Sequence, residues 1–168
     1  LINGAYGLGE NIVLGAVNPD QFYVFKPALK KGFRSIISKK LGSKKIKMIY
    51  RKHRGRTTAN VEVQYAERFK FVLKDDEILK LAKWACIIED YYSAKAKKFK
   101  PMDMEWAKDG ETNELFIVQA RPETVQSRKN FNILEEYYLK EKGQVIVTGL
   151  SVGMKIGAGK AHVIKSAR

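Results

Sequence analysis

"MDMEWAKDGETNELFIVQARP", residues 102–122, has the pattern of two short strands joined by a turn. Residues 102–108 alternate apolar and polar side chains, and residues 114–120 are rich in β-branched and aromatic ones. The segment between them, "DGETN" (109–113), opens with an Asp-Gly pair, which favours a turn between antiparallel strands. The stretch therefore predicts a β-hairpin.

The two predicted strands each present a polar and an apolar face, because successive side chains of a strand point to opposite sides. Asp103 and Glu105 share a face of the first strand, and Gln119 and Arg121 share a face of the second. If Glu105 lies opposite Gln119, then Asp103 lies opposite Arg121, and one face carries two carboxylates, an amide oxygen and a guanidinium. The other face is expected to be apolar and to face a core; its residues are Met102, Met104, Trp106, Phe116, Val118 and Ala120.

The polar face of this hairpin fits either a metal–phosphate site or an ordinary solvated surface. Carboxylate and amide oxygens are hard ligands, suited to Mg²⁺ that keeps several waters and bridges phosphates. An arginine beside them, here Arg121, neutralises charge on a transferring phosphoryl group. Alternatively, the face is half exposed and holds an Asp103–Arg121 cross-strand pair, since polar strand faces are common. The residues alone leave both interpretations open.

A second candidate site is the glycine-rich stretch "GLGENIVLGAVNPDQF", residues 7–22. The segment "GAYGLG" (4–9) matches neither the dinucleotide-binding fingerprint nor a P-loop, which needs Gly-Lys-Ser/Thr. Gly7 and Gly9 either let backbone N–H groups approach a phosphate or simply form turns. We expect a loop with a short helix or strand, ending in the turn at 18–20.

The remaining patterns predict an α+β fold. Apolar residues recur at helical spacing within 74–99, which predicts the clearest helix of the chain. The other predicted elements are a strand at 22–27, a short helix within 28–42, strands at 44–51 and 57–65, a linker helix over 128–142, and short strands from Gly143 onward.

The chain has 168 residues and is strongly basic, with 32 Lys and Arg against 18 Asp and Glu, a net charge of +14. Such an excess favours anionic partners, which are nucleic acid, acidic lipid headgroups or a phosphorylated small molecule, or it reflects a solvated basic surface. The absence of an aromatic platform motif argues against nucleic acid. A single cysteine, no signal peptide and no apolar run of the ~20 residues that cross a bilayer lead us to expect a cytoplasmic protein without a membrane partner.

Three motifs together closely resemble the phosphoenolpyruvate synthase family, also called pyruvate, water dikinases. They are "GLGENIVLGAVNPDQF" (7–22), "KPMDMEWAKDG" (100–110) and "LFIVQARPETV" (115–125), which follow the family's order. The resemblance implies an ATP-grasp nucleotide-binding domain that uses Mg²⁺ and ATP. It also implies a gluconeogenic transferase, a homo-oligomer when complete, that converts ATP, pyruvate and water to AMP, phosphoenolpyruvate and phosphate.

The same resemblance assigns roles to residues of both candidate sites. Glu105 and Gln119 resemble the metal ligands of the ATP-grasp site. Arg121 resembles the catalytic arginine that contacts the transferring phosphates, and Asp103 resembles its supporting acid. In the glycine-rich stretch, Glu10 resembles the acidic residue close to the bound nucleotide. The implied nucleotide-binding residues are Gly7, Gly9, Glu10, Asp103, Glu105, Gln119 and Arg121.

The resemblance also implies a domain order. Residues 1–127 correspond to the C-terminal part of the ATP-grasp domain, 128–142 to a linker helix, and 143–168 to the start of a swivelling phosphohistidine domain. The family accepts the phosphoryl group on a histidine within a Thr-Ser/Cys-His motif, which this chain lacks; His162 does not match it. We therefore expect an internal piece of the enzyme that turns over no ATP by itself.

Two alternative functions stay open from the sequence. One is a related ATP-grasp dikinase or an antibiotic phosphotransferase, which would use another phosphoryl acceptor. The other is a non-catalytic basic module that binds nucleic acid, for which steep salt dependence of binding is expected.

Overall fold

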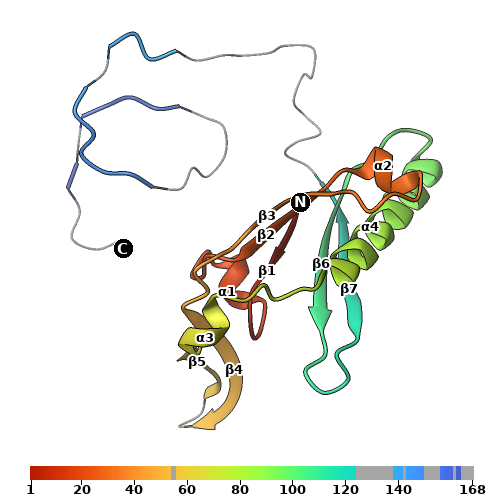
Figure 1. Cartoon of the computed structure of the whole chain (residues 1–168), viewed down its shortest axis with the longest axis horizontal. Coiled ribbons are helices and arrows are strands. Elements are labelled where there is room, and N and C mark those ends of the chain that lie inside the picture. The colour runs from red at the N-terminus through yellow and green to blue at the C-terminus, as the bar shows by residue number, and fades with distance from the viewer. Residues whose placement is uncertain (54–55, 124–137, 142, 150–155, 161, 164–168) are drawn as a thin grey trace. The chain divides into compact units, whose positions relative to one another are not determined.

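A computed structural model describes residues 1–53, 56–123, 138–141, 143–149, 156–160 and 162–163 of the chain (Figure 1). The chain divides into two units, Leu1–Lys129 and Asn130–Arg168. The first unit mixes helices and strands, whereas the described residues of the second form neither. No helix among the described residues is both long and apolar enough to cross a membrane.

The described strands form three antiparallel sheets, β1–β2–β3, β4–β5 and β6–β7. This mixture of helix and strand confirms the α+β composition that the sequence predicted. In chain order the elements are β1 (Ile2–Gly4), α1 (Glu10–Val13), β2 (Asp20–Val24), α2 (Lys26–Lys30), β3 (Ile36–Lys40), β4 (Ile46–His53), β5 (Arg56–Glu62), α3 (Tyr65–Arg68), α4 (Asp75–Ala96), β6 (Met102–Lys108) and β7 (Leu115–Pro122).

Helix α4 organises the first unit, because it contacts α2, strands β2 and β3, and the β6–β7 hairpin (Figure 1). It confirms the helix predicted within 74–99, and its buried residues recur at helical spacing. Two core clusters form around it. The first comprises Phe22, Leu73, Ile78, Leu81 and Leu115, and the second comprises Leu29, Leu79, Ala82 and Cys86.

The boundaries of α4 have local causes. Three acidic residues occupy its first turn, where they complement the positive end of the helix dipole. The Glu77 carboxylate accepts a hydrogen bond from the backbone N–H of Lys74 at 2.8 Å, which satisfies one of the free donors of that turn. At the other end, Lys97 adopts a left-handed conformation with φ of +52°, which terminates the helix.

The helix predicted within 28–42 is wrong for most of that stretch. Only α2 is helical there, and it begins earlier, with Pro27 in its first turn, where the fixed φ of proline favours a helix start. The backbone then turns at Gly32, with φ of +89°. Strand β3 follows and pairs with β2. The β-branched Ile36 and Ile37 suit that strand, and the pairing overrides the helical propensity of the neighbouring residues.

The other predicted strands of the first unit are present. Strand β2 confirms the strand expected at 22–27, although it begins at Asp20 and ends at Val24. Strands β4 and β5 confirm the pair expected at 44–51 and 57–65. An isolated parallel bridge between Gly7 and Met48 joins β4 to the glycine-rich stretch.

The second unit differs from its predicted secondary structure wherever it is described. Most of the linker helix predicted over 128–142 lies outside the described residues, and residues 138–141 are not helical. The short strands predicted from Gly143 onward are absent from 143–149, 156–160 and 162–163. A strand needs a neighbour for its backbone N–H and C=O groups. The described residues of this unit contain no such neighbour, and Ile146 is 94% exposed.

Candidate functional site

The β6–β7 hairpin has the register under which the four polar residues share one face. Glu105 lies opposite Gln119, and Asp103 lies opposite Arg121. Directly opposed residues of an antiparallel pair have Cβ atoms about 4.5–5.5 Å apart, so each pair is within reach of one ligand. All four side chains are exposed, which leaves this face accessible.

A β-bulge interrupts the hairpin beside this face. Glu105 pairs with Gln119, but the next residue, Trp106, pairs with Ile117, so Val118 is the extra residue. A bulge shifts the alternation of side chains beyond it by one position, and such bulges often re-aim side chains next to functional sites.

The bulge corrects the predicted apolar face. Phe116 and Val118 were expected to face the core, but they are 48% and 60% exposed and lie on the accessible side of β7. Leu115 is buried instead, and Ile117 packs against the first core cluster. The half-buried members of the predicted apolar face are Met102, Met104, Trp106 and Ala120.

Asp103 and Arg121 share a register position without forming an ion pair. Within the described part of the chain, neither side chain makes a hydrogen bond or an ion pair. The cross-strand pair of the solvated-surface interpretation is therefore not formed. The Arg121 guanidinium keeps its hydrogen-bond donors available for a ligand.

Glu105 and Gln119 supply two oxygen donors of the kind that Mg²⁺ prefers. Across the described residues, no group of three or more His, Cys, Asp or Glu side chains is placed to hold a metal ion. A metal on this pair would take its remaining ligands from phosphate oxygens and water. Mg²⁺ binds in that way in phosphate sites, so the donor set fits this ion.

The glycine-rich stretch forms a loop and the short helix α1. Gly7 has φ of +80°, and a Cβ there would lie 2.3 Å from the carbonyl oxygen of Met48, so only glycine fits. Gly9 is the N-cap of α1 with φ of −66°, and a Cβ there would meet no atom within 4 Å. Glu10 begins α1 and is exposed.

Neighbouring elements hold this loop in place. The backbone N–H of Leu8 donates to Met48 O at 2.9 Å. The Tyr6 hydroxyl donates to Glu67 O at 3.3 Å, and burial followed by the nearby Glu67 carboxylate raises the pKa of Tyr6. No hydrogen bond or ion pair among the described residues joins Glu10 to the polar hairpin residues. The structure therefore brings together the two pairs on the hairpin but leaves the glycine loop as a separate part of the candidate site.

Trp106 connects these two parts. The indole Nε1–H of Trp106 donates to the backbone carbonyl of Asn3 in β1 at 3.1 Å, and β1 leads directly into the glycine loop. The sequence placed Trp106 only on an apolar face. The hydrogen bond joins residues that are more than a hundred positions apart in the sequence, so no local pattern predicts it.

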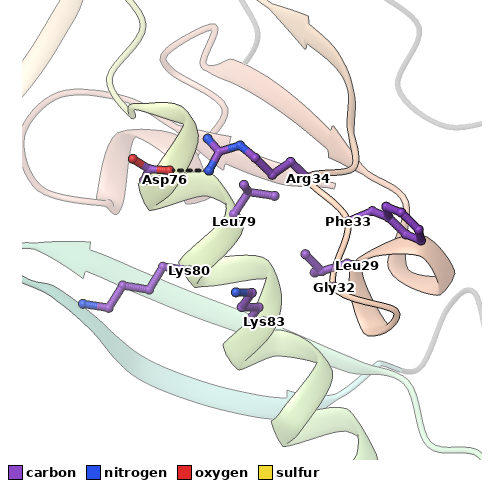
Figure 2. A pocket seen from close by; sticks show the side chains of 8 residues that line it. All are labelled: Leu29, Gly32, Phe33, Arg34, Asp76, Leu79, Lys80 and Lys83. Carbon is purple, nitrogen blue, oxygen red and sulfur yellow. Dashed lines mark hydrogen bonds and ion pairs between the residues drawn. The ribbon is translucent and has the colours of Figure 1, made fainter.

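Sequence reasoning also missed a cavity of about 310 Å³ between the turn after α2 and the first turns of α4 (Figure 2). Figure 2 shows the Arg34 guanidinium directed at the Asp76 carboxylate, 2.8 Å away. Lys80 extends away from Leu29 and Phe33, and its ammonium lies over the Trp84 ring. Of the three basic side chains that line the cavity, Arg34 and Lys80 thus have partners within the chain. None of the predicted site residues lines the cavity.

The chain is similar to known proteins over nearly its whole length. Residues 1–142 match the family described as pyruvate phosphate dikinase, AMP/ATP-binding domain. The chain is 60% identical over 166 residues to the phosphoenolpyruvate synthase of Synechocystis sp., an alignment that covers 99% of this chain and 20% of that protein. It is 54% identical to the same enzyme of Aquifex aeolicus (98% and 20% covered) and 37% identical to that of Pyrococcus furiosus (98% and 19% covered).

The chain spans about a fifth of the length of these curated relatives. The family match covers all the described helices and strands, including the glycine loop and the hairpin with its paired polar residues. The chain therefore belongs to the pyruvate phosphate dikinase AMP/ATP-binding domain family, and it closely resembles one segment of the phosphoenolpyruvate synthases.

Proposed function

We propose that this chain supplies part of the Mg·ATP site of a phosphoenolpyruvate synthase, a gluconeogenic enzyme that converts ATP, pyruvate and water to AMP, phosphoenolpyruvate and phosphate through a phosphohistidine. The observation that carries the proposal is the exposed pairing of Glu105 with Gln119 beside Asp103 and Arg121. The names of the relatives support the reaction, and the family supports ATP as the nucleotide.

In this proposal the hairpin face positions the ATP phosphates. Glu105 and Gln119 hold Mg²⁺, which when bound neutralises phosphate charge. Arg121 donates hydrogen bonds to the phosphate oxygens, and charge-assisted bonds of this kind are about twice as strong as neutral ones. Asp103, opposite Arg121, is the acid that orients the guanidinium once a ligand has ordered it. Phosphoryl transfer depends mainly on such positioning and charge stabilisation.

The glycine loop has a smaller proposed role. Its backbone N–H groups at Gly7 and Gly9 approach the nucleotide, with Glu10 nearby. The open space at Gly9 supports this role, because a Cβ there would meet no atom within 4 Å and the backbone beside it is accessible.

The finer organisation belongs to the same proposal. Residues 1–127 form the C-terminal part of an ATP-grasp domain, 128–142 the linker, and 143–168 the start of the phosphohistidine domain. The complete enzyme is a cytoplasmic homo-oligomer with pyruvate as its second substrate, and the 168-residue chain alone turns over no ATP. The motif resemblance supports these statements.

The test uses a chimeric enzyme, the Synechocystis relative with its matching segment replaced by this chain. Glu105→Ala and Gln119→Ala should each lower pyruvate-dependent AMP formation. The expected loss is about a thousandfold for Glu105→Ala, since a metal ion contributes several kcal/mol to the transition state and each ~1.4 kcal/mol is tenfold in rate. Glu111→Ala is the matched control, because Glu111 is an exposed acid in the turn of the same hairpin.

The control variant should keep the activity of the unaltered chimera. Circular dichroism and thermal unfolding should show all three variants folded, because the altered side chains are exposed. A folded Glu105→Ala variant with a near-normal rate would refute the metal-ligand assignment.

A further inference from the structure

We propose that Trp106 is a positioning residue for the Glu105–Gln119 pair, an inference that rests on the function proposed above. Trp106 directly follows Glu105 in β6, at the step where the bulge occurs. Side chains of consecutive strand residues point to opposite faces, so the two side chains do not face the same surface. Trp106 therefore acts on Glu105 through the backbone that they share.

Two contacts fix the Trp106 ring on β1. Its Nε1–H donates to Asn3 O at 3.1 Å. A Cβ on Gly4 would lie 3.1 Å from Cζ2 and 3.5 Å from Cη2 of the ring, so the indole rests close to the backbone of Gly4. The ring also packs against the first core cluster. The inner side of β6 is thus held at the residue that borders the bulge.

The bulge makes this attachment important for the site. Two-stranded ribbons are only marginally stable by themselves, and a slip of the pairing register by one residue would turn a strand's side chains to the other face. The ion pair between Lys108 and Glu77, 2.7 Å long, ties the turn end of β6 to α4. At the bulge, Trp106 attaches β6 to β1 in a similar way. This attachment fixes the directions of the Glu105 and Gln119 side chains.

The same contact links the hairpin to the glycine loop. Strand β1 ends at Gly4, and the loop continues to Gly7, which is bridged to Met48. Because Trp106 bonds to β1, the backbone that carries Glu105 and the backbone that leads to Glu10 are held to one another. Trp106 thereby sets the spacing of the two parts of the proposed nucleotide site.

Two variants of the chimeric enzyme test this role. Trp106→Phe keeps an aromatic ring in the core but removes the N–H donor. Gly4→Ala keeps the indole but adds a methyl group that would lie 2.6 Å from Val72 Cγ2 and 3.1 Å from the indole, so Val72 has to move and the ring has to give by a few tenths of an ångström. Leu29→Ala is the stability control, because Leu29 belongs to the second core cluster and not to the Trp106 contacts.

The principal readout is direct binding of Mn²⁺, measured by electron paramagnetic resonance in the presence of a non-hydrolysable ATP analogue. Both test variants should bind Mn²⁺ about tenfold more weakly, the lower end of the effect seen when residues that orient metal ligands are changed. The KM for Mg·ATP should rise while the KM for pyruvate stays the same. Leu29→Ala should lower the unfolding midpoint at least as much as Trp106→Phe and leave Mn²⁺ affinity unchanged.

The possible outcomes separate this inference from the proposed function. If Glu105→Gln abolishes Mn²⁺ binding but Trp106→Phe and Gly4→Ala bind like the unaltered chimera, the positioning role is overturned and the proposed function stands. If Leu29→Ala weakens Mn²⁺ binding as much as the test variants, the effect reflects general stability and the positioning role is again overturned. If Glu105→Gln binds Mn²⁺ normally, the proposed function fails, and the inference fails with it.

Discussion

Asp20 and Lys44 form an ion pair in which both side chains are fully buried, with Nζ and Oδ1 2.5 Å apart. Every remaining polar group of the pair has a partner. Asp20 also accepts the backbone N–H groups of Gly42 at 2.8 Å and Val72 at 2.9 Å, and Lys44 donates to Gly42 O at 3.0 Å. These bonds join β2, the segment before β4 and the segment before α4. A buried charge pair holds a fold together only when it is fully satisfied in this way.

Removing one member of this pair is expected to destabilise the first unit by about 3–5 kcal/mol, because an uncompensated charge stays buried. The loss of stability for Lys44→Met should lie at the low end of this range, since the Asp20 carboxylate keeps two backbone donors. The loss for Asp20→Leu should lie at the high end of this range, since the Lys44 ammonium and the N–H groups of Gly42 and Val72 all lose their acceptor. Urea denaturation of each variant measures the loss.

Arg34→Gln is the matched control for the buried pair. Its ion pair with Asp76 is exposed on both sides, so its loss should change the free energy of unfolding by less than about 1 kcal/mol. Equal losses for Arg34→Gln and Lys44→Met would contradict the structural role given to the buried pair.

Gly7 and Gly9 are close in sequence but differ in what they require. Gly7→Ala should lower the free energy of unfolding by more than about 2 kcal/mol, because a methyl group would enter left-handed backbone against Met48 O. Gly9→Ala should be neutral or stabilise by up to about 1 kcal/mol, because its backbone is already helical and the space is open. Denaturant unfolding of both variants checks this order, and a tolerated Gly7→Ala would show that the bridge to Met48 is not needed.

At the scale of single elements, the bulge in the β6–β7 hairpin decides which side chains of β7 face the core. Ile117→Ala should destabilise the first unit by about 2 kcal/mol, because Ile117 packs against the core. Val118→Ala should change the free energy of unfolding by no more than about 0.5 kcal/mol, because Val118 is 60% exposed. Simple alternation along β7 predicts the opposite order, so denaturation of the two variants distinguishes the bulged strand from a regular one.

The contact between β6 and α4 predicts a dependence of stability on pH. Burial alone would raise the pKa of Glu77, but the ammonium of Lys108 and the backbone N–H of Lys74 outweigh it and hold the pKa below its usual 4.5. The stabilisation is therefore present above pH 4.5 and is lost as the pH falls through the lowered pKa. The difference in unfolding free energy between the unaltered chain and Glu77→Gln should shrink on acidification from neutral pH. A constant difference would mean that the carboxylate has no lowered pKa.

The sequence predicted well those elements that are marked by a pattern among neighbouring residues. Helix α4 has apolar residues at a helical period over about four turns, and two apolar-rich stretches on either side of an Asp-Gly pair mark the hairpin. The pairing of Glu105 with Gln119 depends on the bulge and so did not follow from the turn. The bulge escaped prediction because Phe116, Ile117 and Val118 are all apolar, so no alternation marks the extra residue. Strand β3 escaped because its partner β2 is distant in sequence, and the ion pair of Asp20 escaped for the same reason. Such tertiary pairings leave no local signal.

At the scale of the whole molecule, the positions of the charged residues show which of them are paired. Acidic residues of α4 are paired with basic residues of the segment from α2 to β3. These pairs are Lys26–Glu89, Lys30–Asp90, Arg34–Asp76 and Lys39–Asp75. With these four pairs neutral, the net charge of +14 arises from basic residues outside them. That excess suits a polyanionic ligand such as ATP, in agreement with the family of the chain.

The most direct measurement is a crystal structure of the chimeric enzyme with Mn²⁺, as an anomalous marker for Mg²⁺, and a non-hydrolysable ATP analogue. We expect metal density within about 2.2 Å of both a Glu105 carboxylate oxygen and the Gln119 amide oxygen, with the other ligands from phosphate and water. Arg121 should contact the same phosphates. Metal bound to the nucleotide but to neither Glu105 nor Gln119 would show that this hairpin face is not the metal–phosphate site.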